Sequence, residues 1–215
     1  MCMIVDEKDS KVLVADKEIV CYKIVECGEI LGTGKTVCAT PCQLMEIGGD
    51  VIAGRMPLKP LIPAQEGYEI TKDRAIVSGE TECAYTVEGG FIHVYSQLDP
   101  IWLKNEIVRL NSYIGQEEVI EGRSQRRLIE KKTIRNKGTL LYRCVIPEGA
   151  KYIVGRTYTR TYTEGYNVPS YAASEIMFKE LIGAFTCSRT NYATLGNLMD
   201  RCEKIVEREK EKCVQ

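Results

Sequence analysis

The sequence predicts an α+β fold: a mixed, mostly antiparallel sheet with two or three helices, including an amphipathic C-terminal helix. Short segments rich in β-branched residues alternate with turns of Gly, Pro, Asp and charged residues, which is typical of hairpin-connected strands. Two segments instead place apolar residues every three or four positions, which is typical of helices that pack on a sheet. At 215 residues the chain can bury one sizeable core, so we expect a single domain spanning residues 1–215.

The composition is that of an ordinary globular protein, with 44% hydrophobic and 27% charged residues. No apolar run approaches the ~20 residues that a membrane-spanning helix needs. The first nine residues lack the basic and apolar regions of a secretory signal. We therefore expect a soluble, cytoplasmic protein without a membrane partner.

The chain contains ten cysteines, and most of them lie in apolar runs. A thiol in such a run behaves as a small hydrophobic residue, and disulfide scaffolds are typical of short secreted chains. Cys38 and Cys42 form a C-x3-C pair, but a structural zinc site needs a second close pair at ligand spacing. We expect reduced thiols and no metal.

The N-terminal third is predicted to consist of strands and turns. Residues 11–15 and 19–25 are strand-like, and residues 28–36 are rich in glycine. The Gly34-Lys35-Thr36 run suggests a phosphate-binding P-loop, but Glu29 occupies the position of its first glycine. A hairpin turn explains these glycines better.

The middle of the chain is predicted to alternate strands and helices. Residues 81–97 are strand-like, and Asp99 followed by Pro100 is typical of a helix N-cap and first turn. We expect a second helix over residues 116–135. Strands over residues 139–146 and 151–155 should then flank a turn at residues 147–149.

The C-terminal segment from residue 191 is predicted to be a helix. Charged residues occupy one face, and the apolar residues share the other: Leu195, Leu198, Met199, Cys202, Ile205, Val206 and Cys213. Packing of this face on the sheet is the favoured interpretation. The alternative is a structural or assembly protein that forms homo-oligomers through residues 191–213.

Positive charge is concentrated in the segment from Arg123 to Arg160. This segment has eleven basic and two acidic residues, a charge of +9, whereas the rest has eighteen basic and twenty-eight acidic residues, a charge of −10. The two sums recover the net charge of −1. Such a segment favours a phosphate-bearing ligand, a nucleic acid or an acidic protein as the partner.

Two patterns within this segment predict a ligand-binding surface. One places basic residues four positions apart, which would form a stripe on a helix: Arg123, Arg127, Lys131 and Arg135. The other alternates with threonines, which would form one face of an edge strand or a protruding arm: Arg156, Tyr158, Arg160 and Tyr162. Arginine supplies forked donors for phosphate, and tyrosine supplies a ring on which a base stacks. The alternative interpretation is a solvated hairpin without a ligand.

His93 is the single histidine of the chain, so any imidazole chemistry must use it. It alternates with Phe91 and Tyr95, which places all three on one strand face. We expect a hydrogen-bonded histidine on a half-buried sheet. A Cys–His nucleophilic pair stays an alternative, although no local motif selects one cysteine.

Four short segments resemble a family of short, uncharacterised proteins from phages and gut Bacteroidetes. The matching segments are residues 1–6 (Met-Cys-Met-Ile-Val-Asp), 20–24 (Val-Cys-Tyr-Lys-Ile), 90–95 (Gly-Phe-Ile-His-Val-Tyr) and 142–150 (Tyr-Arg-Cys-Val-Ile-Pro-Glu-Gly-Ala). The resemblance implies a mobile-element setting, a bacterial or host-cell cytosol, and a host-interaction or counter-defence role. It implies no particular activity.

A second resemblance is to ADP-ribosyltransferases, which use NAD. Those enzymes place a basic residue on an early strand, a serine or tyrosine mid-chain and a glutamate on a late strand. Lys23, Ser96 and Glu175 are the positional counterparts here, with Lys23 in place of the family's usual Arg or His. The resemblance implies these three as catalytic residues and NAD as the cofactor.

The charge distribution favours a non-enzymatic binding protein without a cofactor. Its basic surface would engage a phosphate-rich small ligand, a nucleic acid or an acidic protein. The NAD-using enzyme and the assembly protein are the two alternatives.

Overall fold

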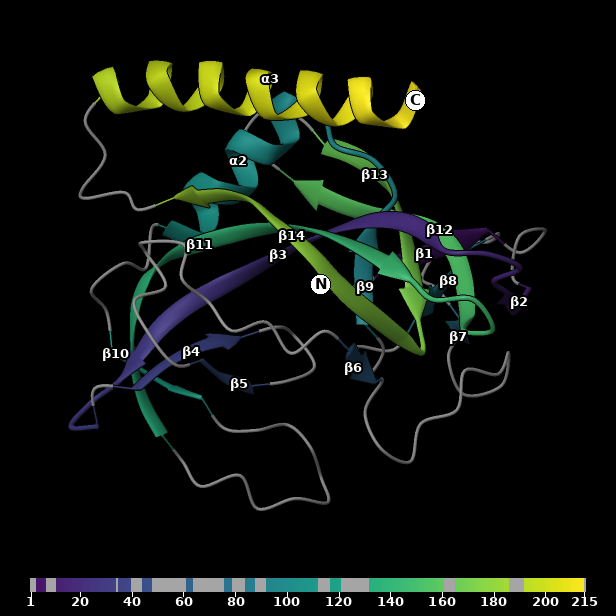
Figure 1. The fold of residues 1–215 in the computed structure, drawn as a ribbon, viewed down its shortest axis with the longest axis horizontal. Helices are drawn as coiled ribbons and strands as arrows, with labels where there is room; N and C mark the ends of the chain where they lie inside the picture. Colours follow the sequence, from purple (N-terminus) through teal and green to yellow (C-terminus); the bar gives the residue numbers. More distant parts are fainter. Residues whose placement is uncertain are drawn as a thin grey trace.

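The computed structural model describes residues 3–6, 11–33, 35–39, 44–47, 61–63, 76–78, 84–87, 92–111, 117–120, 132–160, 165–185 and 192–214. Within these ranges the strands form one sheet of 14 strands, and every strand pair is antiparallel. Two helices lie on the same side of the sheet (Figure 1). The predicted α+β class with a mostly antiparallel sheet is confirmed.

The elements follow the chain in this order: β1 Met3–Asp6, β2 Leu13–Val14, β3 Ile19–Ile30, β4 Lys35–Ala39, β5 Leu44–Ile47, β6 Leu61–Pro63, β7 Ile76–Ser78, β8 Ala84–Val87, β9 Ile92–Tyr95, α2 Pro100–Asn111, β10 Glu117–Ile120, β11 Lys132–Ile146, β12 Lys151–Arg160, β13 Gly165–Ala173, β14 Glu175–Phe185 and α3 Tyr192–Val214. The main path across the sheet is β6-β14-β11-β3-β9-β13-β12-β1-β8-β7. The hairpin predicted at residues 28–36 is the β3–β4 hairpin, where Gly32 has a φ of 79°.

One face of the sheet is covered by α2 and α3 (Figure 1). Side chains at alternate strand positions, such as Tyr22, Leu141 and Phe185, meet apolar residues of the two helices. The helices contribute Trp102, Leu103, Ile107, Leu198, Cys202 and Val206 to this cluster. Burying each large side chain contributes about 1.5–3 kcal/mol. The apolar side of α3 is therefore used within the chain.

The intervening strand residues form a second apolar cluster on the opposite face. Its members include Val25, Tyr142 and Phe178, with the Tyr142 and Phe178 rings edge to face at 5.0 Å between centroids. Cys21 and Cys144 belong to this cluster as buried free thiols, cross-strand partners in register. They pack as small hydrophobic residues, as their apolar surroundings predict.

Asp99 begins α2 in the predicted way. Its carboxylate accepts a hydrogen bond of 2.8 Å from the backbone N–H of Trp102, and its carbonyl accepts one of 2.9 Å from the N–H of Leu103. Pro100 is the first helical residue, where a missing N–H costs nothing. The predicted start of this helix is confirmed.

The helix predicted over residues 116–135 is wrong. Residues 117–120 form β10, which pairs with the start of β11 from Glu117↔Arg135 to Ile120↔Lys132. The β-branched residues at 119, 120, 133 and 134 favour strands, and the four-residue charge spacing was not accompanied by an apolar helical stripe. Residues 121–131 lie outside the described ranges. At residues 136–138 the chain forms a bulge, in which the side chain of Asn136 accepts a hydrogen bond from Gly138 N–H.

The Arg–Tyr strand, expected at an edge or as a protruding arm, lies inside the sheet at Arg156 and Thr157, where strands pair with it on both sides. For residues 158–160 the described pairing is with β13. This strand is β12, which pairs with β13 on one side and with β1 and β2 on the other. Its threonine face is not solvated at Thr157, which is buried and shares a hydrogen bond of 2.9 Å with Ser170. Because this hydroxyl finds a buried partner, a polar face can pack inside the sheet.

No helix in the described part of the chain is long and apolar enough to cross a bilayer.

The close approach of β14 to α3 predicts opposite effects for two glycine substitutions. A Cβ at Gly183 would lie 2.8 Å from the buried Phe185 ring and 3.2 Å from Ile205, whereas a Cβ at Gly196 would meet nothing within 4 Å. We expect Gly183→Ala to lower the free energy of unfolding by about 1–3 kcal/mol through overpacking. The control Gly196→Ala, in α3, should raise it by roughly 0.5–1 kcal/mol. Urea denaturation measures both, and an unchanged Gly183→Ala would contradict this packing.

An ion pair between β11 and α3 predicts a pH-dependent stability. The guanidinium of Arg143 donates hydrogen bonds of 2.7 and 2.9 Å to the buried carboxylate of Glu209. Burial raises the pKa of Glu209, but Arg143, followed by Lys212, outweighs burial and lowers it overall. A lowered carboxyl pKa contributes stability that is present above the ordinary pKa and is lost as pH falls through the folded-state pKa.

We therefore expect Glu209→Gln to destabilise the protein at neutral pH by about 1–3 kcal/mol. The difference from wild type should shrink as the pH falls below the ordinary glutamate range. Glu207→Gln, on the exposed side of α3, is the matched control and should have little effect at any pH. Thermal unfolding across the acid range measures this, and a difference that grows on acidification would contradict the assignment.

Candidate functional site

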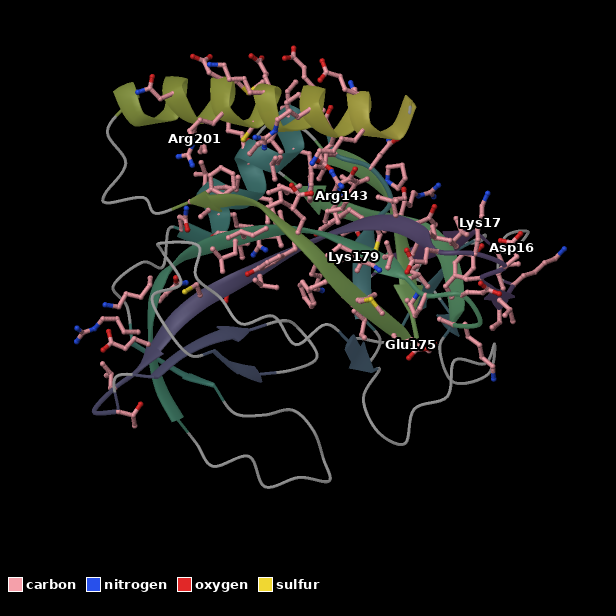
Figure 2. All side chains as sticks on the ribbon, viewed as in Figure 1. Asp16, Lys17, Arg143, Glu175, Lys179 and Arg201 are labelled. Carbon is pink, nitrogen blue, oxygen red and sulfur yellow. The ribbon has the colours of Figure 1, made fainter. Side chains whose placement is uncertain are left out.

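The structure divides the basic segment among separate places. Arg143 points toward α3 (Figure 2), where Glu209 and Glu180 neutralise it at 2.7 and 3.2 Å. Lys137 pairs with Glu29 at 2.8 Å, which lowers the pKa of that carboxyl. Three strands, β3, β9 and β13, separate β11 from β12 in the sheet. The basic residues of this segment whose side chains the structure describes therefore do not form one continuous surface.

The predicted ligand-binding residues fall into three groups. Arg135 lies exposed on β11, in register with Glu29 and Glu117. Strand β12 carries Arg156, Tyr158 and Arg160 at alternate positions, which is one face of that strand. Four predicted residues lie outside the described ranges: Arg123, Arg127, Lys131 and Tyr162. The structure thus keeps the β12 residues together and places Arg135 elsewhere.

The β12 residues continue a face that begins earlier in the strand and extends onto β13. We call it the tyrosine–arginine face and define it as Tyr152, Val154 and Arg156 of β12 with Pro169 and Tyr171 of β13; Tyr158 and Arg160 continue the same alternation along the backbone, and their side chains lie outside the described part of the structure. The register pairs Val154 with Tyr171 and Arg156 with Pro169. The side chain of Val154 is 39% exposed. Leu13 of β2, which pairs in register with Tyr152, is 38% exposed. This face is therefore an accessible surface of mixed aromatic, apolar and basic character.

Two tyrosine rings are the best-defined part of this face. The rings of Tyr152 and Tyr171 lie edge to face, with centroids 5.6 Å apart and an interplanar angle of 84°. Ser96 forms a hydrogen bond with Tyr171. Both tyrosines are half-buried. Burial, followed by Tyr152 and Cys21, raises the pKa of Tyr171, and the Ser96 bond partly opposes this rise.

Sequence reasoning missed Tyr152 and Tyr171 as members of the site. The period-two pattern that selected Arg156 also extends upstream to Val154 and Tyr152, so this signal was present. Tyr171 had no such signal, because it depends on the pairing of β12 with β13.

The three residues implied by the ADP-ribosyltransferase resemblance are not brought together. Lys23 is buried on β3, and its ammonium donates a hydrogen bond of 2.6 Å to the carbonyl of His93. Ser96 directly follows β9, the strand beside β3, whose last residue Tyr95 pairs with Tyr22. Glu175 starts β14 at the end away from the helices (Figure 2). Lys23 pairs in register with Tyr142 of β11, and Tyr142 pairs with Leu181 of β14. At ~3.3 Å per residue, Leu181 and Glu175 are about 20 Å apart along β14, so Glu175 lies far from the register position of Lys23.

Among the residues whose side chains the structure describes, no three His, Cys, Asp or Glu side chains are arranged to hold a metal ion. Cys42 lies outside the described ranges. His93 is buried on β9, in register with Ala172.

The Tyr171–Ser96 bond predicts a measurable change in tyrosine ionisation. Because the bond lowers the pKa of Tyr171, we expect Ser96→Ala to raise that pKa above the wild-type value. Tyr152→Phe removes a neighbouring ionisable group that raises it, so this control should change the pKa in the opposite direction. An alkaline titration followed by NMR of ring-labelled tyrosine measures both. An unchanged pKa in Ser96→Ala would mean that the two side chains are not bonded.

Comparison with protein-family models, with curated proteins and with solved structures finds no match to this chain. The chemistry of its own residues is therefore the basis for assigning a function.

Proposed function

We propose that this chain is a non-enzymatic binding protein that engages a phosphate-bearing ligand, a nucleic acid or an acidic protein through the tyrosine–arginine face. The observation that carries the proposal is the combination of Arg156 with the partly exposed Tyr152 and Tyr171 on one side of β12 and β13. A guanidinium offers forked donors to a phosphate or carboxylate, and a tyrosine offers a flat ring. In a mobile-element setting such a ligand would belong to the host.

The buried opposite side of β12 and its pairing with β13 support the proposal. Ile153 and Thr157, on the opposite side of the strand, are buried, and β13 pairs with β12 along its whole length. The backbone that carries the face is therefore already ordered, which reduces the entropy lost on binding.

Two other basic residues in the described part of the segment are weaker candidates. Lys137 and Arg143 already contact carboxylates, so a ligand would have to displace those partners. The separation of Lys23 from Glu175 weighs against the NAD alternative, because its implied catalytic groups would have to meet at one site. The burial of the apolar side of α3 leaves mainly its charged side for an assembly role.

Removing both arginines of β12 should test the proposal. We expect Arg156→Ala with Arg160→Ala to weaken binding to single-stranded and duplex DNA and to heparin, which together sample phosphate and other polyanions. The slope of log affinity against log salt should fall by about 1 per lost phosphate contact. Fluorescence anisotropy at several salt concentrations measures both quantities.

The matched control is Lys204→Ala with Lys210→Ala, which removes the same charge from the exposed side of α3. Equal losses in the two double variants would indicate non-specific attraction and contradict the proposed face. A wild-type protein that binds none of the polyanions, nor an acidic peptide, would overturn the proposal. Thermal unfolding of each variant separates lost binding from lost folding, since Arg156 also has interactions within the chain.

A further inference from the structure

We infer that the ligand of the tyrosine–arginine face is single-stranded nucleic acid, with a base stacked on the Tyr152–Tyr171 pair. This inference rests on the proposed function and specifies its ligand.

The first argument is the accessibility of aromatic rings next to apolar surface. Tyr152 and Tyr171 are half-buried, and Val154 beside them is 39% exposed. The two rings pack against each other and against the apolar cluster opposite the helices, so the accessible part of each ring lies beside Val154 on a firm apolar base. A nucleobase has an apolar π-face that stacks on such a ring, and each stacked base contributes about 1–3 kcal/mol.

The second argument is that the Tyr171 ring is already held in place. The edge-to-face contact with Tyr152 at 5.6 Å and the packing of both rings against the apolar cluster opposite the helices restrict the ring. A ring with so little remaining freedom loses little entropy when a base stacks on it.

The third argument is the order of residue types along the strand. Tyr152, Val154 and Arg156 follow one another at about 6.6 Å spacing, because side chains on one face recur every second residue, and the sequence continues this alternation with Tyr and Arg at positions 158 and 160. Aromatic and cationic positions thus follow one line, as a ligand with alternating bases and phosphates requires. Arg156 has interactions within the chain, so the inference depends on the rings and not on an unpaired charge.

The fourth argument distinguishes a single strand from a duplex. In a duplex the faces of the bases are stacked on each other, so a sheet-borne tyrosine has no base to stack against. An acidic protein would likewise satisfy the arginines without requiring flat rings. The aromatic pair therefore favours unpaired bases.

The test compares three fluorescent probes with wild type and four single variants. The probes are a single strand of about 12 thymidines, within the usual site sizes of stacking platforms, a DNA duplex of the same length, and heparin, which has charge but no bases. Tyr171→Leu and Tyr152→Leu remove the ring and keep apolar bulk. Tyr171→Phe and Tyr152→Phe are the matched controls that keep the ring. Anisotropy gives the affinities, and circular dichroism verifies folding.

We expect wild type to bind the single strand at least about tenfold more tightly than the duplex or heparin. Each leucine variant should lose about fivefold to a hundredfold for the single strand only, which corresponds to the energy of one stacked base. Each phenylalanine variant should stay within about threefold of wild type for the same reason. Equal binding of all three probes with unaffected leucine variants would overturn the inference and leave the proposed polyanion-binding function intact. The inference would also be overturned if the Arg156→Ala with Arg160→Ala variant lost binding to all three probes while the leucine variants bound them as wild type does. That result too would leave the proposed polyanion-binding function intact.

Discussion

The antiparallel pairing of β3 with β11 is the constraint on which the rest of the structure depends. The two strands pair from Ile134↔Ile30 to Ile146↔Ile19, along the full length of β3. Because side chains alternate across a strand, this one register contributes residues to both apolar clusters. Tyr22 and Leu141 face the helices, and Cys21 and Cys144 face the other way. A slip of one residue would exchange the two sets, so the burial of both faces fixes the register.

The same pairing decides how the basic segment is used. Arg143 projects from β11 toward α3, so it serves as a partner for Glu209 and Glu180 and not for a ligand. Bonds from Arg201 to the carbonyl of Ala184 and from Lys212 to Glu180 add to this attachment of α3. Basic residues close together in sequence thus have different roles, because alternate positions on neighbouring strands face different environments.

Much of the fold could be predicted where a local chemical signal exists. The Asp99 cap, the β3–β4 hairpin, the turn at Gly149 and the C-terminal helix all have such signals, and the structure contains each of them. Residues 116–135 had a charge spacing without an apolar stripe, and there the prediction was wrong. The candidate site was predicted in part. The alternation of Arg156, Tyr158 and Arg160 is a strand pattern, and these residues lie on a strand. The basic stripe that was expected beside them depended on the incorrect helix over residues 116–135.

The sequence by itself determined the fold class, the strand periodicity of β12 and the apolar side of α3, because each follows from the spacing of neighbouring residues. Only the tertiary structure decided that β12 is an interior strand, that Tyr171 lies beside Tyr152, and that Arg143 faces a carboxylate. These features depend on which strands pair and in which register. Strand pairing joins residues distant in sequence, and its energy comes from burial that no local pattern records.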